Sequence, residues 1–223
     1  MYLVDLIGYL ETKKNNLDND QPITAEIANN CDEIYQDMRD DESIWVYSPH
    51  MFRYQGEKIT SMDIYSKIQN KTNLFLRDMI TIYRYTDFDA HFLAAFEEGS
   101  LFVKDVSEYY FDKDAIRTDP VYRGDEWNGE RQNGRSAYRD RTTKRYNPDG
   151  KDPGNVWLNE IRTESKGKVL DRTKPFPQKE TIHRCIRASS RPGETITLLW
   201  PRSELVAAID DERNNVEILT NHE

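Results

Sequence analysis

Arginine and tyrosine alternate through residues 131–146, RQNGRSAYRDRTTKRY, in a combination that suits a nucleic-acid surface. Guanidinium groups bind phosphate oxygens and guanine edges, and tyrosine rings stack on bases. The side chains that we expect to contact nucleic acid are Arg131, Arg135, Arg139, Arg141, Lys144 and Arg145. The alternative for the same stretch is a solvated, arginine-rich loop without a ligand.

Charge is distributed unevenly along the 223 residues. Residues 131–191 carry 16 Lys and Arg against 7 Asp and Glu, a balance of +9, so the rest of the chain carries −18 within a whole-chain charge of −9. An acidic protein would ordinarily repel nucleic acid. The basic segment is therefore the part of the chain to which an anionic partner would bind.

Other kinds of chemistry have little support in the sequence. The four histidines share no ligand spacing, and Cys31 and Cys185 stand far apart outside any CxxC or Cys/His cluster, so we expect two buried thiols, no disulfide and no metal site. No apolar run approaches 18 residues, and MYLVDLIGYLETKK lacks the pattern of a secretory signal. We expect a cytoplasmic protein without a membrane partner.

The elements that would position these residues alternate between strand and helix patterns. Short apolar runs predict strands over residues 2–10, 43–48, 76–85, 195–200 and 215–219, and a strand pair over 100–105 and 108–117. Amphipathic spacing predicts helices over 23–38 (with Thr24 a possible N-cap), 59–72, 178–190 and 203–214, and a short helix over 91–99. This alternation predicts one α/β domain over residues 1–223, with a mixed, mostly parallel sheet and helices on both faces.

Periodicity is lost between residues 120 and 173, where Gly, Asn, Asp and Arg dominate. We expect an irregular basic insert here, because a loop of this length inside a compact domain is usually functional or disordered.

Several blocks of the sequence resemble the DNA aminomethyltransferases that methylate N4 of cytosine or N6 of adenine, in the order that places the catalytic half first. These blocks are VDLI, EIYQDMRDDESIWV, PHMFRYQGE, FVKDVSEYYFDKDAIR, GKDPGNVW and PFPQKETIHRCIRASSRPGE, at residues 4–7, 33–46, 49–57, 102–117, 150–157 and 175–194. The resemblance implies a methyltransferase sheet, S-adenosylmethionine as cofactor and DNA as partner. It also implies that the basic insert serves target recognition in a DNA modification or restriction-modification system.

The resemblance carries site residues to particular positions. Phe176 and Lys179 fall in the block that helps to frame the cofactor, and Glu217 falls where an acid at a strand end holds ribose hydroxyls. An exposed surface glutamate is the alternative for Glu217. The family's catalytic tetrapeptide, a polar residue followed by Pro-Pro-aromatic, would lie after VDLI, where Tyr9 and Glu11 are the weak candidates for base stacking and for accepting from an amine.

Two departures from the family pattern fall on the places where the reaction occurs. The strand 195–200 is followed by Pro201, Arg202, Ser203 and Glu204 instead of a glycine-rich turn, and neither tetrapeptide proline is present. We therefore expect weak or no cofactor binding and impaired catalysis, in a protein that binds DNA or an intact methyltransferase subunit. Two alternatives stay open: an active enzyme with a divergent or partner-completed site, and an acidic, non-enzymatic interaction protein.

Overall fold

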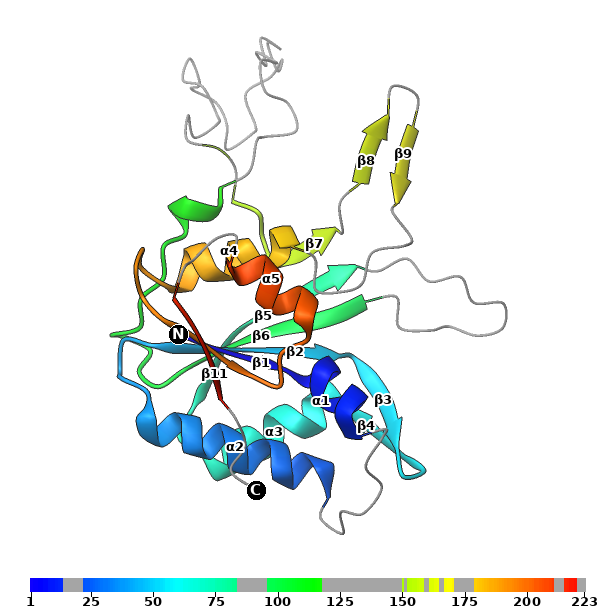
Figure 1. Cartoon of the computed structure of the whole chain (residues 1–223), viewed down its shortest axis with the longest axis vertical. Coiled ribbons are helices and arrows are strands. Elements are labelled where there is room, and N and C mark those ends of the chain that lie inside the picture. Colours follow the sequence, from blue (N-terminus) through cyan, green and yellow to red (C-terminus); the bar gives the residue numbers. More distant parts are fainter. Residues whose placement is uncertain are drawn as a thin grey trace, which may run out of the picture.

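The computed structural model describes residues 1–13, 22–83, 96–117, 150, 152–158, 161–164, 167–170, 179–210 and 215–219. A seven-stranded sheet runs through this part of the chain in the order β11-β10-β1-β2-β6-β5-β7 (Figure 1). The strands are β1 Tyr2–Asp5, β2 Ser43–Pro49, β5 Phe75–Tyr83, β6 Phe96–Val103, β7 Val156–Leu158, β10 Ile196–Leu199 and β11 Val216–Leu219. Only β6 runs against the others, so the predicted mixed and mostly parallel sheet is confirmed.

Helices cover both faces of the sheet, as predicted. On one face lie α1 Leu6–Lys13, α2 Ile23–Asp37 and α3 Ser61–Lys71, and on the other lie α4 Lys179–Ser189 and α5 Ser203–Asp210 (Figure 1). A 3₁₀ turn, η1, spans Asp114–Ile116, and two hairpins pair β3 Met51–Tyr54 with β4 Glu57–Thr60 and β8 Ile161–Glu164 with β9 Gly167–Leu170. Central strand β2 is buried over Ser43–Ser48, as expected of a strand that is covered on both faces.

The helix predictions are confirmed where the apolar spacing is regular. In α2, the residues Ile23, Ile27, Cys31 and Ile34 are all buried, three or four positions apart. The predicted cap is wrong, because Pro22 precedes the helix and Thr24 lies within it. Helix α3 starts at a capping box in which the Thr60 side chain accepts from the Asp63 amide.

Three local predictions are wrong. The strand predicted over residues 2–10 ends at Asp5, and the apolar residues that follow begin α1. The described part of the helix predicted over 91–99 belongs to β6, because two flanking strands pair with it. The strand predicted over 108–117 contains η1 and otherwise irregular chain.

Residues 120–173 are not irregular throughout, because β7, β8 and β9 lie inside this range. Strand β7 pairs in parallel with β5 and contributes the buried ring of Trp157 to the core beneath α4. The base of the predicted insert is therefore part of the sheet.

Candidate functional site

Strands β10 and β1 are parallel neighbours, and the chain leaves their carboxyl ends towards opposite sides of the sheet. From β10 the chain passes through α5 to β11 on one side, and from β1 it continues to β2 on the other. Such a reversal of strand order opens a crevice outside the carboxyl ends of the strands, where open α/β sheets bind ligands. The candidate site is therefore the junction between the end of β1 and the end of β10.

Asp5, the last residue of β1, occupies the centre of this junction. Its side chain is fully buried, and Oδ1 accepts hydrogen bonds from the amides of Ile7 and Gly8 at 3.1 Å each. Oδ2 accepts from the amide of Arg202 at 3.3 Å and from its Nε at 2.8 Å. One carboxylate thus caps α1 and holds the turn after β10 by an ion pair with a side chain that is only 11% exposed.

The turn after β10 lies directly against the first turn of α1. Trp200 has a φ of 55°, in the left-handed region that residues with a side chain rarely adopt, and its ring centroid lies 4.3 Å from that of Tyr9. A Cβ atom added to Gly8 would lie 2.2 Å from the Trp200 carbonyl oxygen, so only glycine permits this approach. The chain itself consequently fills the space directly between the ends of β1 and β10, and the same turn lines the space that remains open.

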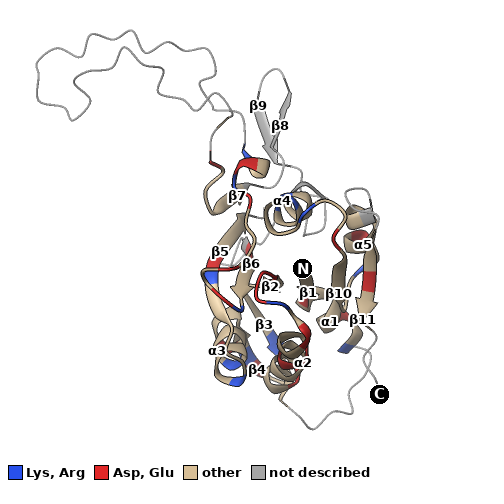
Figure 2. Ribbon diagram, turned by 90° about the vertical axis from the view of Figure 1, so that its left-hand side faces the viewer, with Lys and Arg blue, Asp and Glu red and all other residues tan. Residues whose placement is uncertain are grey.

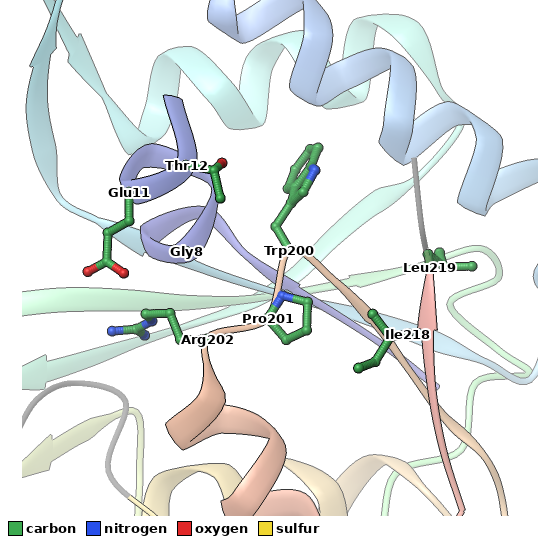
Figure 3. A pocket seen from close by; sticks show the side chains of 8 residues that line it. All are labelled: Gly8, Glu11, Thr12, Trp200, Pro201, Arg202, Ile218 and Leu219. Carbon is green, nitrogen blue, oxygen red and sulfur yellow. The ribbon is translucent and has the colours of Figure 1, made fainter. Parts of the chain in front are cut away.

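A pocket of about 430 Å³ remains beside the filled crevice (Figure 3). Trp200, Pro201, Ile218 and Leu219 make its apolar side, and Gly8, Glu11, Thr12 and Arg202 make the opposite side. The Nη2 atom of Arg202 is buried and has no hydrogen-bond partner among the described residues. The pocket therefore offers an apolar surface opposite a carboxylate and a hydroxyl, and the buried Nη2 lies behind its wall.

The two weak catalytic candidates lie in different surroundings. Tyr9 is 1% exposed and packs between α1 and the rest of the core, and burial followed by the proximity of Glu26 raises the pKa of its hydroxyl above the ordinary value. Glu11 is exposed and lines the pocket. Within the pocket, only Glu11 of this pair is available to a ligand.

Among the remaining predicted site residues, only Glu217 has a described side chain, and it does not line the pocket. Glu217 is exposed on β11, one residue before the pocket residue Ile218. Lys179 begins α4, but its side chain lies outside the described residues, as does Phe176. The six basic candidates, Arg131, Arg135, Arg139, Arg141, Lys144 and Arg145, also lie outside the described residues.

Sequence reasoning did not identify Asp5 and Arg202 as a pair. The available signal was an acidic residue that interrupts an apolar run at a strand end, and a single cation in the turn after another strand. The two residues are 197 positions apart in the sequence, and their contact depends on the order of strands in the sheet.

A second buried polar group lies at the same edge of the sheet. Glu98 of β6 is 5% exposed, its Oε1 lies 2.9 Å from Nδ1 of His50, and its Oε2 accepts from the Tyr65 hydroxyl at 3.4 Å. Within the described ranges, no group of three His, Cys, Asp or Glu could hold a metal ion. No helix in those ranges is long and apolar enough to cross a membrane.

Comparison with solved structures gives the same fold at low sequence identity. A putative DNA modification methylase from Thermus thermophilus, TTHA0409, is 13% identical, with a TM-score of 0.53 over 99% of this chain and 81% of that one. The cytosine-N4-specific PvuII DNA methyltransferase is 10% identical, with a TM-score of 0.55 over 87% and 64% of the two chains. M1.HpyAVI is also 10% identical, with a TM-score of 0.50 over 99% and 80%.

No curated protein matches the sequence. The family model for N6/N4 DNA methylases matches residues 11–197, which is most of the chain. Asp5 and the turn at residues 200–202 lie outside the matched stretch, whereas all the strands from β2 to β9 lie inside it. From the family match and the order of its sheet, this chain belongs to the N6/N4 DNA methylase family.

Proposed function

We propose that this protein is a DNA N4-cytosine/N6-adenine methyltransferase relative in which methyl transfer is impaired and which acts by binding DNA, a partner subunit or both. The observation that carries the proposal is the filled junction between β1 and β10. Trp200 and Arg202 lie where a ligand would enter, Trp200 against the Tyr9 ring and Arg202 held by Asp5. Proximity catalysis requires both reactants in near-attack geometry, so a partly filled crevice reduces its contribution.

The backbone donors at this junction also fit S-adenosylmethionine poorly. The amides of Ile7, Gly8 and Arg202 all donate to Asp5, and Pro201 has no amide hydrogen. A ligand carboxylate would therefore find few free backbone donors and would lie close to the buried Asp5 carboxylate. These features support weak or no binding of the cofactor that the family implies.

Thermal unfolding with excess S-adenosylmethionine tests the proposal. A ligand at 100 times its Kd stabilises the folded state by about 2.7 kcal/mol, which for a chain of this size is a shift of roughly 5–11 °C in Tm. We expect no shift, together with no transfer of tritiated methyl groups to DNA, while an active enzyme of the family responds in both assays. A shift and transfer by the isolated chain would overturn the proposal.

The pocket favours a second candidate, an active enzyme whose ligand site has moved outward. Its apolar side and the carboxylate of Glu11 could hold a molecule with an aromatic part and a polar end. If S-adenosylmethionine does raise Tm, Glu11→Ala should reduce the shift and Glu204→Ala, a change in the same charge outside the pocket, should not. Equal shifts in both variants would exclude the pocket as the cofactor site.

DNA is the partner that the family suggests, and the cytoplasm is the compartment in which we propose that the protein acts. The basic segment 131–145 supports binding to DNA, alone or alongside an intact methyltransferase subunit in a restriction-modification system. Co-purification with such a subunit, and DNA affinity that falls as salt rises, would distinguish this function from that of an acidic interaction protein.

A further inference from the structure

Most of the Lys and Arg side chains that the structure describes contact an acidic, polar or aromatic group, and the exceptions lie in one segment. Four Lys and Arg side chains have no ion pair, hydrogen bond or ring contact with a described residue: Arg53 and Lys58 on the β3–β4 hairpin and Lys67 and Lys71 on α3. The other cations with described side chains all have such a contact. The unpaired cations thus lie within one continuous segment, residues 53–71, which we call the hairpin patch.

The cations of the hairpin patch are arranged as two like-charged pairs. Arg53 lies directly opposite Lys58 in the antiparallel register, where side chains are about 5 Å apart at Cβ. Lys67 and Lys71 are one helical turn apart on α3, about 6 Å along its axis. Like charges at either spacing destabilise the isolated element. Both pairs would be stabilised by an anion that neutralises them.

The shape of the hairpin exposes its charges while its other side chains hold it in place. Gln55 and Gly56 both have positive φ, as a tight two-residue hairpin turn requires. Phe52, Tyr54 and Ile59 pack against the core on one face, whereas Arg53 and Lys58 are exposed on the other. The hairpin therefore presents two cations to solvent on a backbone that loses little conformational freedom on binding.

The hairpin lies at the ligand-binding edge of the sheet, whereas α3 runs from it towards the opposite edge, where Phe75 begins β5 beside the start of β2. Strand β3 follows the carboxyl end of β2 directly, and its Tyr54 lies close enough to Tyr9 of α1 to influence the pKa of that residue. In Figure 1 the hairpin extends beyond α1 at this edge, and in Figure 2 the ribbon of the hairpin and of α3 carries basic residues, drawn in blue. Exposed Met51 and Met62, 36% and 51% accessible, lie among these cations.

We propose that the hairpin patch binds the sugar-phosphate backbone of double-stranded DNA, at a place separate from the basic insert. This inference rests on the proposed DNA-binding function. Two pairs of neighbouring cations without acidic partners are complementary to the regularly spaced phosphates of a duplex. Their arrangement does not place them against base edges. The hairpin cations fix the position of DNA next to α1 and the pocket, those of α3 contact phosphates further along the duplex, and sequence reading is left to other residues.

The salt dependence of DNA affinity tests the inference. In B-DNA each phosphate contact adds about 0.9 to the slope of log K against log salt, which at 0.1 M salt is about eightfold in affinity. We expect Arg53→Gln/Lys58→Gln to reduce the slope by about 2 and to weaken binding about sixtyfold, equally for duplexes of unrelated sequence. Lys67→Gln/Lys71→Gln should have a similar effect.

The matched control removes two paired cations at the opposite edge of the sheet. Arg39 precedes β2 and Lys104 follows β6, and both have acidic partners, so Arg39→Gln/Lys104→Gln makes the same change in net charge. The Tm of each variant shows whether it remains folded. A hairpin variant that loses no more affinity than this control overturns the inference.

Failure of the inference differs visibly from failure of the proposed function. If the unmodified chain binds DNA and Arg139→Gln/Arg141→Gln alone lowers the salt slope, DNA binding stands and the hairpin patch has no role in it. If the unmodified chain does not bind DNA at any salt concentration, both proposals are wrong. Loss of binding to phosphatidylserine vesicles in the hairpin variants, without DNA binding, would assign the patch to a membrane surface instead.

Discussion

The ion pair between Asp5 and Arg202 should contribute strongly to stability. Asp5→Asn tests this contribution, because it removes the negative charge and keeps the shape of the side chain. Asparagine keeps an oxygen for the amides of Ile7 and Gly8, but it leaves the Arg202 guanidinium, 11% exposed, without a counter-charge. Removing one partner of a buried pair costs about 3–5 kcal/mol. For 223 residues we therefore expect Tm to fall by roughly 8–16 °C at about 4 kcal/mol.

A double-mutant cycle tests this reasoning through thermal or urea unfolding. Arg202→Met should be similarly damaging, because it leaves the Asp5 carboxylate buried with one fewer donor. Asp5→Asn/Arg202→Met removes both charges, so its loss should be smaller than the sum of the single losses by at least about 1 kcal/mol. Asp114→Asn, which breaks a surface pair with a 76% exposed carboxylate, is the control and should cost under about 1 kcal/mol. Single losses that add within about 0.5 kcal/mol would refute the coupling.

Three further changes have defined outcomes. Gly8→Ala should destabilise the protein by about 1–3 kcal/mol despite the better helix propensity of alanine, because its Cβ would clash with the Trp200 carbonyl. An unchanged or increased Tm would contradict the close approach. Thr60→Ala should lower the unfolding free energy by about 1 kcal/mol through loss of the α3 capping box, measured against Thr60→Ser, which keeps the hydroxyl. Burial raises the pKa of Cys31 and Cys185 to about 12, so the unfolded chain loses these protons first and stability should decline as pH rises above about 9. Urea midpoints that decline equally steeply after replacing both cysteines with alanine would show that the thiols are not responsible.

Elements with regular apolar spacing could be predicted because their burial decides their structure. Helix α2 places buried residues three and four positions apart, and β2 is a continuous apolar run between polar turns. Strand β6 was missed at its start because Glu97 and Glu98 favour helix locally, whereas pairing with both β2 and β5 determines the observed strand.

The site was harder to predict because its geometry arises from contacts between distant segments. In VDLIGYL the local sign of a change from strand to helix is Asp5, a residue type favoured at helix N-caps, but the apolar spacing alone continues the strand past it. The sequence does reveal that Trp200 and Pro201 replace a glycine-rich turn, but not that the tryptophan turns back onto Tyr9. That contact requires β1 and β10 to be neighbours, a property of the whole sheet.

The pairing of β1 with β10 also constrains how this chain folds during synthesis. Tyr2 pairs with Thr197, so an inner strand of the sheet obtains one of its two neighbours only after synthesis has reached residue 197. At about 5–20 residues per second, synthesis of the intervening chain takes on the order of 10–40 s. During this time β1 can pair with β2 while its other edge remains open, and contacts of such long sequence separation form slowly. We expect the nascent chain to depend on protection of this open edge, so that slower release of residues 196–199 increases aggregation before it affects the finished fold.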